Sequence, residues 1–266
     1  MSGLRLDAAI AQRGLARSRS LAARLIEQGL VTVDGERVLR PAYQVTEDQR
    51  ISLAASDHYV SRAAHKLIGA LDGFRIDPAG RVCLDAGAST GGFSQVLLER
   101  GAARVIAIDV GRGQLSPEIR DNPRLVPLEG INIRYFTREQ LEPRLESAAL
   151  PTLVVADLSF ISLTMVLAAL KAVADPDADL VLLIKPQFEV GRTGIRAGIV
   201  RTASLRAEAI MGVLRAAWEL GLGTAGLMSS PILGSHGNHE YLVHLSARGG
   251  TNPSEWMQQA TETAGA

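Results

Sequence analysis

The sequence predicts an α/β protein in which a doubly wound parallel sheet follows a small α+β unit. Between residues 60 and 246, short and continuously apolar runs alternate with helical segments, which is typical of parallel strands buried on both faces. Before residue 55 the pattern is two helices and a hairpin, whose turn is Asp34-Gly35. We therefore divide the chain into a first domain at 1–55, a linker at 56–60, a second domain at 61–246 and a tail at 247–266, with a short helix near Trp256.

The composition is that of an ordinary globular protein. The 266 residues include 28 basic and 28 acidic groups, so the formal net charge is zero. The longest apolar stretches are interrupted by Lys171 or Lys185 and are shorter than the roughly 20 residues that span a bilayer. No secretory leader is visible, and the single cysteine, Cys83, excludes a disulfide framework and is expected in the core. We expect a soluble cytoplasmic protein without a membrane partner.

The first domain has a strongly uneven charge. Leu6, Ala9, Ile10 and Leu15 predict one helical face, and Ser18 is a candidate N-cap for a second helix over 20–28. Residues 1–24 hold five arginines and one acid, a local charge of +4 that the overall zero conceals. Such a face suits phosphate groups, although solvated surface arginines are an equal alternative on charge alone.

Motifs in this domain resemble the S4 RNA-binding module. The similarity rests on Arg5-Leu6-Asp7, the Gly14 turn, the run from Ala16 to Arg19, and the strand and turn at 31–35. It implies RNA binding through the arginine face, and Arg62, which lies in the helical segment of the second domain, is a further candidate. The RNA-binding candidates are Arg5, Arg13, Arg17, Arg19, Arg24 and Arg62.

Charged residues follow five predicted strands of the second domain: Asp85, Asp109, Glu129, Asp157 and Lys185. In doubly wound sheets, ligands bind at the carboxyl ends of the strands. One such residue is usually a turn or helix cap, but five along the same edge indicate a polar ligand.

The glycine turn after the first of these strands indicates the class of ligand. Asp85-x-Gly87-x-x-x-Gly91-Gly92 lacks the Gly-x-Gly spacing of dinucleotide sites and resembles motif I of class I S-adenosylmethionine-dependent methyltransferases. Asp109, 24 residues after Asp85, stands where an acid accepts hydrogen bonds from ribose hydroxyls. A nicotinamide enzyme also places an acid there, so a dinucleotide or phosphate site is the alternative. The expected S-adenosylmethionine site comprises Asp85, Gly87, Ser89, Thr90, Gly91, Gly92, Phe93, Asp109, Asn132 and Asp157.

Four residues, two of them at the strand ends named above, match a catalytic pattern. Lys66, Asp157, Lys185 and Glu240 occur in the order and flanking pattern of the Lys–Asp–Lys–Glu tetrad of FtsJ-like ribose 2′-O-methyltransferases. The chain has only three lysines, and two of them fall in this pattern. Together with the S4-like module, the chain resembles the TlyA family of ribosomal-RNA 2′-O-methyltransferases, whose members are also labelled hemolysins.

The resemblance implies methylation of a cytidine ribose in large-subunit ribosomal RNA, with small-subunit RNA as an open second target. A lysine ammonium can stabilise a developing alkoxide, and a neutral lysine can accept its proton. We assign this role to Lys185, with Lys66 holding the target hydroxyl, and Asp157 and Glu240 holding the two lysines. The partners implied are ribosomal RNA and ribosomal subunits, and the oligomeric state stays open.

Parts of the sequence are compatible with a different function. The tetrapeptide Asp157-Leu158-Ser159-Phe160 is similar to the motif of amino-methyltransferases, but it lacks their prolines, so base methylation ranks below ribose methylation. A catalytically inactive RNA-binding protein and a membrane-lytic hemolysin are two further candidate functions.

Two groups of residues have weaker interpretations. His236, His239 and His244 invite a metal site, but their spacing favours none. The segment 191–206 is glycine-rich and basic, and it either clamps RNA or is a solvated connection; its arginines are Arg192, Arg196, Arg201 and Arg206. Lys171 is expected to be a solvated helix residue.

Overall fold

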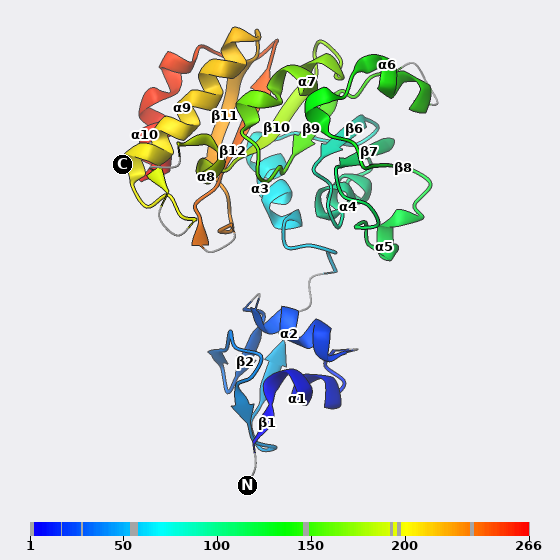
Figure 1. Ribbon diagram of the computed structural model, residues 1–266, viewed down its shortest axis with the longest axis vertical. Helices are drawn as coiled ribbons and strands as arrows, with labels where there is room; N and C mark the ends of the chain where they lie inside the picture. Colours follow the sequence, from blue (N-terminus) through cyan, green and yellow to red (C-terminus); the bar gives the residue numbers. More distant parts are fainter. Residues whose placement is uncertain are drawn as a thin grey trace. The chain divides into compact units, whose positions relative to one another are not determined.

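The computed structural model (Figure 1) describes residues 3–16, 18–27, 29–53, 58–145, 149–191, 194–195, 198–234 and 237–265. The chain forms two compact units, Met1–His58 and Tyr59–Ala266.

In its described residues, the first unit has two helices and five short strands. The helices are α1 (Leu6–Gln12) and α2 (Arg19–Glu27). The strands are β1 (Leu4–Arg5), β2 (Val31–Val33), β3 (Glu36–Arg37), β4 (Gln44–Val45) and β5 (Ile51–Leu53). β3, β2 and β5 form one antiparallel sheet, and β1 pairs with β4. Asp34 and Gly35 have φ angles of 52° and 88°, so the hairpin has the turn that the sequence indicates.

The core of this unit is made by the apolar faces of α1 and α2 against β2. Leu6, Ala9 and Ile10 are buried as expected, but the prediction for Leu15 is wrong. Leu15 is 38% exposed because α1 ends at Gln12. The predicted N-cap is present: the backbone N–H of Leu21 donates to the Ser18 hydroxyl at 3.2 Å.

The second unit is built on a seven-stranded sheet in the order β11-β12-β10-β9-β6-β7-β8. Its strands are β6 (Val82–Ala86), β7 (Arg104–Asp109), β8 (Leu125–Glu129), β9 (Leu153–Ala156), β10 (Asp179–Ile184), β11 (Gly223–Ser229) and β12 (Tyr241–Ser246). β6 to β10 are parallel, which confirms the predicted fold class, but β12 is antiparallel to both of its neighbours. The difference arises because the described residues between β11 and β12, 230–234 and 237–240, contain no crossover α-helix. The sequence did not indicate β11.

Helices cover both faces of this sheet (Figure 1). One core contains Cys83 and Val105 with α3 (Ala64–Phe74), α4 (Gly92–Glu99) and α5 (Pro117–Arg120). The other contains Leu84 and Ile106 with α7 (Leu167–Ala172), α9 (Ala203–Glu219) and α10 (Met257–Ala264). Shorter helical elements are η1 (Ile133–Tyr135), α6 (Arg138–Leu141), η2 (Glu142–Arg144), η3 (Leu163–Met165), α8 (Pro186–Glu189) and η6 (Pro253–Trp256).

The structure bears on two expectations from the sequence, the burial of the cysteine and the lack of a membrane span. Cys83 lies fully buried as expected, and burial raises the pKa of its thiol to about 12. None of the helices in the ranges given above has the length and apolar character that crossing a membrane requires.

The C-terminal segment packs onto the second unit. α10 lies against α9 and β11, so the segment that the sequence sets apart as a tail completes one face of the sheet. Arg206 lies in the first turns of α9 and not in a loop. Its guanidinium donates to the Tyr241 hydroxyl at 3.0 Å and to the Ala264 carbonyl at 2.7 Å, which identifies Arg206 as a structural tie.

Candidate active site

The four tetrad residues meet at one edge of the sheet. Asp157 and Lys185 directly follow the parallel strands β9 and β10, and Lys66 lies in the first turn of α3. Glu240 directly precedes β12. Because β12 runs antiparallel to β10, its amino end adjoins the carboxyl end of that strand, where Ile184 pairs with Tyr241. The antiparallel insertion therefore delivers Glu240 to the same edge as the two strand-end residues.

The charges form a chain of alternating sign. Lys185 Nζ lies 2.6 Å from Asp157 Oδ1, Lys66 Nζ lies 3.4 Å from Asp157 Oδ2, and Lys66 Nζ lies 2.7 Å from Glu240 Oε2. The four side chains are between 3% and 14% exposed. In such a place each charge depends on its neighbour, because removing one partner leaves the other desolvated and uncompensated.

The glycine turn lies beside this chain. Gly87 has a φ of +84°, and a Cβ atom there would lie 2.8 Å from the carbonyl oxygen of Asp157. Gly91 has a φ of +96°, and a Cβ atom there would collide with Ile119. Both positions thus require glycine, since the backbone conformation is left-handed and the space is filled. The turn leads directly into α4, whose first residue is Gly92.

Asp85 lies fully buried beneath the turn. Its Oδ2 accepts a hydrogen bond of 2.6 Å from the Ser94 hydroxyl, while its Oδ1 has no hydrogen-bond partner in the described part of the chain. Burial raises the pKa of this carboxyl to about 7. A buried carboxylate oxygen without a partner fits the cationic amino group of an amino-acid-derived cofactor, which would supply the missing charge.

Asp109 is the last residue of β7, and Asn132 lies in the turn between β8 and η1. The Asp109 carboxylate accepts hydrogen bonds from the backbone N–H groups of Ser89 at 2.8 Å and Gly111 at 2.7 Å. Each of its oxygens keeps a lone pair, so it can still accept from a hydroxyl. The Asn132 side chain accepts from the Arg134 N–H at 3.0 Å and caps η1.

A cavity of about 210 Å³ joins the glycine turn to the tetrad. It is lined by Ser61, Arg62, Ala63, Lys66, Gly87, Ala88, Ser89, Thr90, Gly92, Phe93, Asp157, Ser159, Lys185 and Glu240. The predicted residues Asp85, Gly91, Asp109 and Asn132 do not line it. Ser61 and Ser159 do, and the sequence reasoning missed both. The signal for Ser159 was its place two residues after Asp157.

The described RNA-binding candidates of the first unit differ in their partners. Asp7, itself buried, accepts hydrogen bonds from Arg5 at 3.1 and 2.9 Å and from Arg19 at 3.4 Å, and these partners lower the pKa of its carboxyl. Arg13 instead donates to the backbone carbonyls of Thr46, Glu47 and Gln49, at 2.7 to 3.2 Å. Arg5 and Arg19 are thus fixed on one carboxylate, whereas Arg13 stabilises a loop. Arg17 and the side chain of Arg24 lie outside the described residues.

Arg62 and the basic segment after β10 have different positions. Arg62 is exposed and lines the cavity. Arg201 is also exposed, while Arg192 and Arg196 lie outside the described residues. Lys171 is not merely solvated, because its Nζ donates to the Leu220 carbonyl at the end of α9.

The histidines do not assemble in the described segments. His244 Nε2 lies 2.8 Å from Asp179 Oδ1, and His239 is exposed, while His236 lies outside the described residues. Among the residues that the structure describes, no three His, Cys, Asp or Glu side chains are arranged to hold a metal ion.

Comparison with known proteins gives the family. The FtsJ-like methyltransferase model matches residues 59–247, and the S4 domain model matches residues 4–51. A Mycobacterium tuberculosis protein, named 16S/23S rRNA (cytidine-2′-O)-methyltransferase TlyA, is 50% identical over 244 residues, which are 91% of this chain and 89% of the relative. The chain belongs to the TlyA family. The resemblance drawn from the sequence motifs is thereby confirmed.

Two further similar proteins carry different names. A Campylobacter jejuni relative, named 23S rRNA (cytidine-2′-O)-methyltransferase TlyA, is 37% identical over 71% of this chain and 71% of its own length. A solved structure from Streptococcus thermophilus, provisionally named a hemolysin, is 35% identical and has a TM-score of 0.76 over 100% of this chain and 96% of its own.

The glycine turn of this TlyA protein gives a first testable prediction. Gly87→Ala would place a Cβ against the Asp157 carbonyl and impose a left-handed backbone on alanine, a cost of about 1–2 kcal/mol before the clash. We expect at least a tenfold loss of S-adenosylmethionine affinity in calorimetry. Gly80→Ala is the matched control, since Gly80 has a φ of +71° but no atom within 4 Å of the added carbon. Equal affinities of the two variants would contradict the prediction.

Proposed function

We propose that this protein transfers a methyl group from S-adenosylmethionine to the ribose 2′-hydroxyl of cytidines in ribosomal RNA. The observation that carries the proposal is the buried chain of Lys185, Asp157, Lys66 and Glu240, which shares one cavity with the glycine turn. The names of the Mycobacterium and Campylobacter relatives support both the cytidine and the ribosomal RNA.

The tetrad provides what a ribose hydroxyl needs in order to react. When bound, S-adenosylmethionine supplies an electrophilic methyl group on a sulfonium, and the attacking hydroxyl must lose its proton. Lys185, held by Asp157, would accept that proton or stabilise the oxygen's charge as it develops. Lys66, held between Asp157 and Glu240, would hold the target hydroxyl. Because the four side chains are fixed before substrate arrives, orientation contributes to the rate.

RNA binding would be shared by the two units. Arg5 and Arg19 are held on Asp7, so their guanidinium groups are oriented without RNA and are suited to phosphates. Arg62, at the cavity, would contact the RNA near the target nucleotide. Since Arg13 already serves three backbone carbonyls, we expect a smaller share from it than from Arg5.

The test is methyl transfer from labelled S-adenosylmethionine to isolated small and large ribosomal subunits, followed by mapping of the modified nucleotides. A 2′-O-methyl group protects the adjacent linkage from alkaline hydrolysis, whereas a methylated base does not. We expect protected cytidines, and we expect them in both subunits because the 50%-identical relative is named for both. Label on bases, or no label on RNA, would contradict the proposal. The cytoplasm, where ribosomal subunits reside, is the compartment we propose.

A further inference from the structure

The loop after β9 contacts Lys185 at a second point. Lys185 Nζ donates a hydrogen bond of 2.9 Å to the hydroxyl of Ser159, in addition to its 2.6 Å contact with Asp157 Oδ1. Ser159 lines the same cavity as the tetrad. The side chain of Lys185 is only 10% exposed, so these two contacts, and not bulk solvent, determine how its amino group is oriented.

The two contacts leave one direction open on the nitrogen. A neutral lysine nitrogen carries two N–H bonds and one lone pair besides its bond to Cε. Asp157 Oδ1 lies 2.6 Å from the nitrogen but accepts no hydrogen bond from the described residues, so by itself it does not fix the rotation about the Cε–Nζ bond. The Ser159 hydroxyl accepts one N–H, which restricts that rotation and with it the direction of the lone pair.

We propose that Ser159 is a positioning residue for Lys185, which directs the lone pair of the amine toward the hydroxyl to be methylated. The inference rests on the role of Lys185 in the proposed function. Ser159 would act through Lys185 and would not itself need to touch the reacting atoms.

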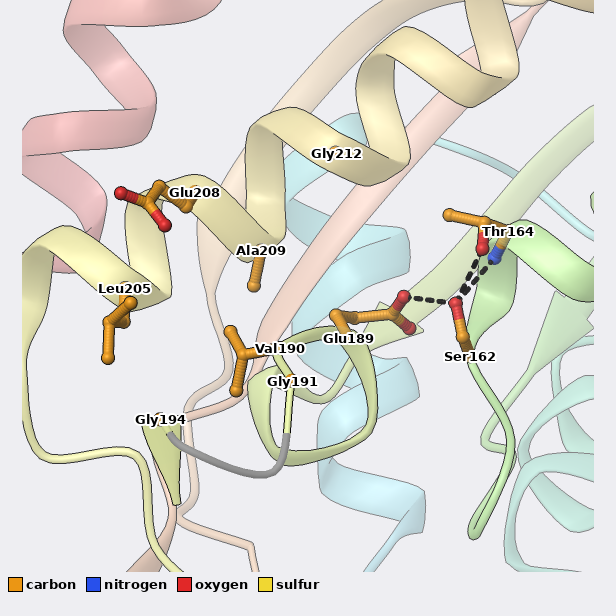
Figure 2. Close-up of a pocket in the computed structure, with 10 residues that line it drawn as sticks. All are labelled: Ser162, Thr164, Glu189, Val190, Gly191, Gly194, Leu205, Glu208, Ala209 and Gly212. Carbon is orange, nitrogen blue, oxygen red and sulfur yellow. Dashed lines mark hydrogen bonds between the residues drawn. The ribbon is translucent and has the colours of Figure 1, made fainter.

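The backbone that carries Ser159 is held independently of its hydroxyl. The next serine of the loop, Ser162, donates a 2.5 Å hydrogen bond to Glu189 Oε2 (Figure 2). The Leu163 N–H donates to Glu189 Oε1 at 2.8 Å. Ser162 and Glu189 line a separate hollow of about 610 Å³, and none of the residues that line it belongs to the tetrad. The aromatic rings of Phe160 and Phe188 also lie close together, with their centroids 5.5 Å apart. Removing the Ser159 hydroxyl therefore leaves the loop anchored.

The experiment compares Ser159→Ala, Ser159→Thr and Ser162→Ala in the full chain, with methyl transfer to ribosomal subunits as the assay. We expect Ser159→Ala to lower kcat by about 10- to 100-fold, the range for misorientation of a catalytic group. KM for RNA and the calorimetric affinity for S-adenosylmethionine should change less than about threefold. Ser159→Thr keeps the hydroxyl and should recover most of kcat. Ser162→Ala loses a loop hydrogen bond away from Lys185 and should stay within about threefold of the parent.

A double variant separates this inference from the proposed function. In a Lys185→Ala background, Ser159→Ala should cause no further loss, because its effect passes through the missing amine. Parent-level kcat in Ser159→Ala, an equal loss in Ser159→Thr or Ser162→Ala, or an additive double variant would overturn the positioning role. If the parent protein methylates no RNA, the proposed function fails instead.

Discussion

Replacing Lys185 by alanine is expected to lower methyl transfer to ribosomal RNA by roughly 100- to 10,000-fold, the usual range for a residue that moves a proton in the transition state. The glycine turn does not include Lys185, so S-adenosylmethionine should still bind. Lys185→Arg keeps a charge but is always protonated and cannot accept a proton. We therefore expect it within about tenfold of the alanine variant. The measurement is kcat with isolated subunits, together with calorimetric titration of the cofactor.

The matched control is Lys171→Ala. Lys171 is the one lysine of the three that lies outside the tetrad, and its Nζ donates to a carbonyl at the exposed end of α9. We expect nearly unchanged kcat and a loss of at most about 1 kcal/mol of stability. Because Lys185→Ala leaves Asp157 with Lys66 alone, melting curves should accompany the assay, and Lys185→Met provides a variant of similar volume. Full activity of the alanine variant would refute the role assigned to Lys185.

The second large effect concerns stability and pH at Asp85. Its native pKa of about 7 lies above the ordinary value of 3.8, so the native carboxyl keeps a proton that the unfolded chain releases. The free energy of unfolding must then fall as the pH rises from about 4 to 7, and the penalty persists above 7. Three pKa units correspond to about 4 kcal/mol. Asp85→Asn lacks this titration, so its stability relative to the parent should improve by up to about 4 kcal/mol between pH 4 and pH 8.

Denaturant unfolding from about pH 2 to about pH 8 checks the prediction, with Asp72→Asn as the control of opposite sign, whose effect appears below about pH 4. Asp72 is exposed and paired with Arg100 at 2.5 Å, and this hydrogen bond lowers the pKa of its carboxyl. The ionised Asp72 carboxylate therefore stabilises the native state above the pKa that this carboxyl has in the unfolded chain, and the contribution is lost as the pH falls below it. Parallel stability curves for Asp85→Asn and the parent would show that the carboxyl is already ionised in the native state.

Much of the site could be predicted from the sequence, because continuous apolar runs show where the buried strands end. Asp157 and Lys185 stand after continuous apolar runs, and parallel strands place such residues along one edge. The apolar pattern could not predict that Glu240 lies at that edge. Glu240 precedes its strand, so its position depends on the strand running antiparallel, and strand direction is set by the connection between strands and not by hydrophobicity. The spacing of residues along the chain also does not predict the hydrogen-bond partners of their side chains. Arg13 and Arg206 looked like RNA contacts, yet each is used to satisfy backbone carbonyls at distant positions.

Hydrogen bonds between residues far apart in the chain are a second kind of feature that could not be predicted from the sequence. The Ser159–Lys185 hydrogen bond spans 26 residues, as does the bond from the Leu163 N–H to Glu189. No sequence pattern around a loop serine such as Ser159, or around a glutamate at a helix end such as Glu189, shows whether its side chain has a specific partner or faces solvent. The Leu15 error has a local cause, because a helix that ends three residues early removes the last apolar position from its face.

The position of β12 has a consequence for how the protein is made. This strand lies between β10 and β11, yet it is the last strand of the sheet to leave the ribosome. Until residue 246 has emerged, β10 presents an unpaired apolar edge, a hazard for association with other nascent chains. Glu240 arrives with the same strand. The ion-pair chain therefore closes only after synthesis of nearly the whole second unit, so we expect methyl transfer to begin only when the sheet is complete.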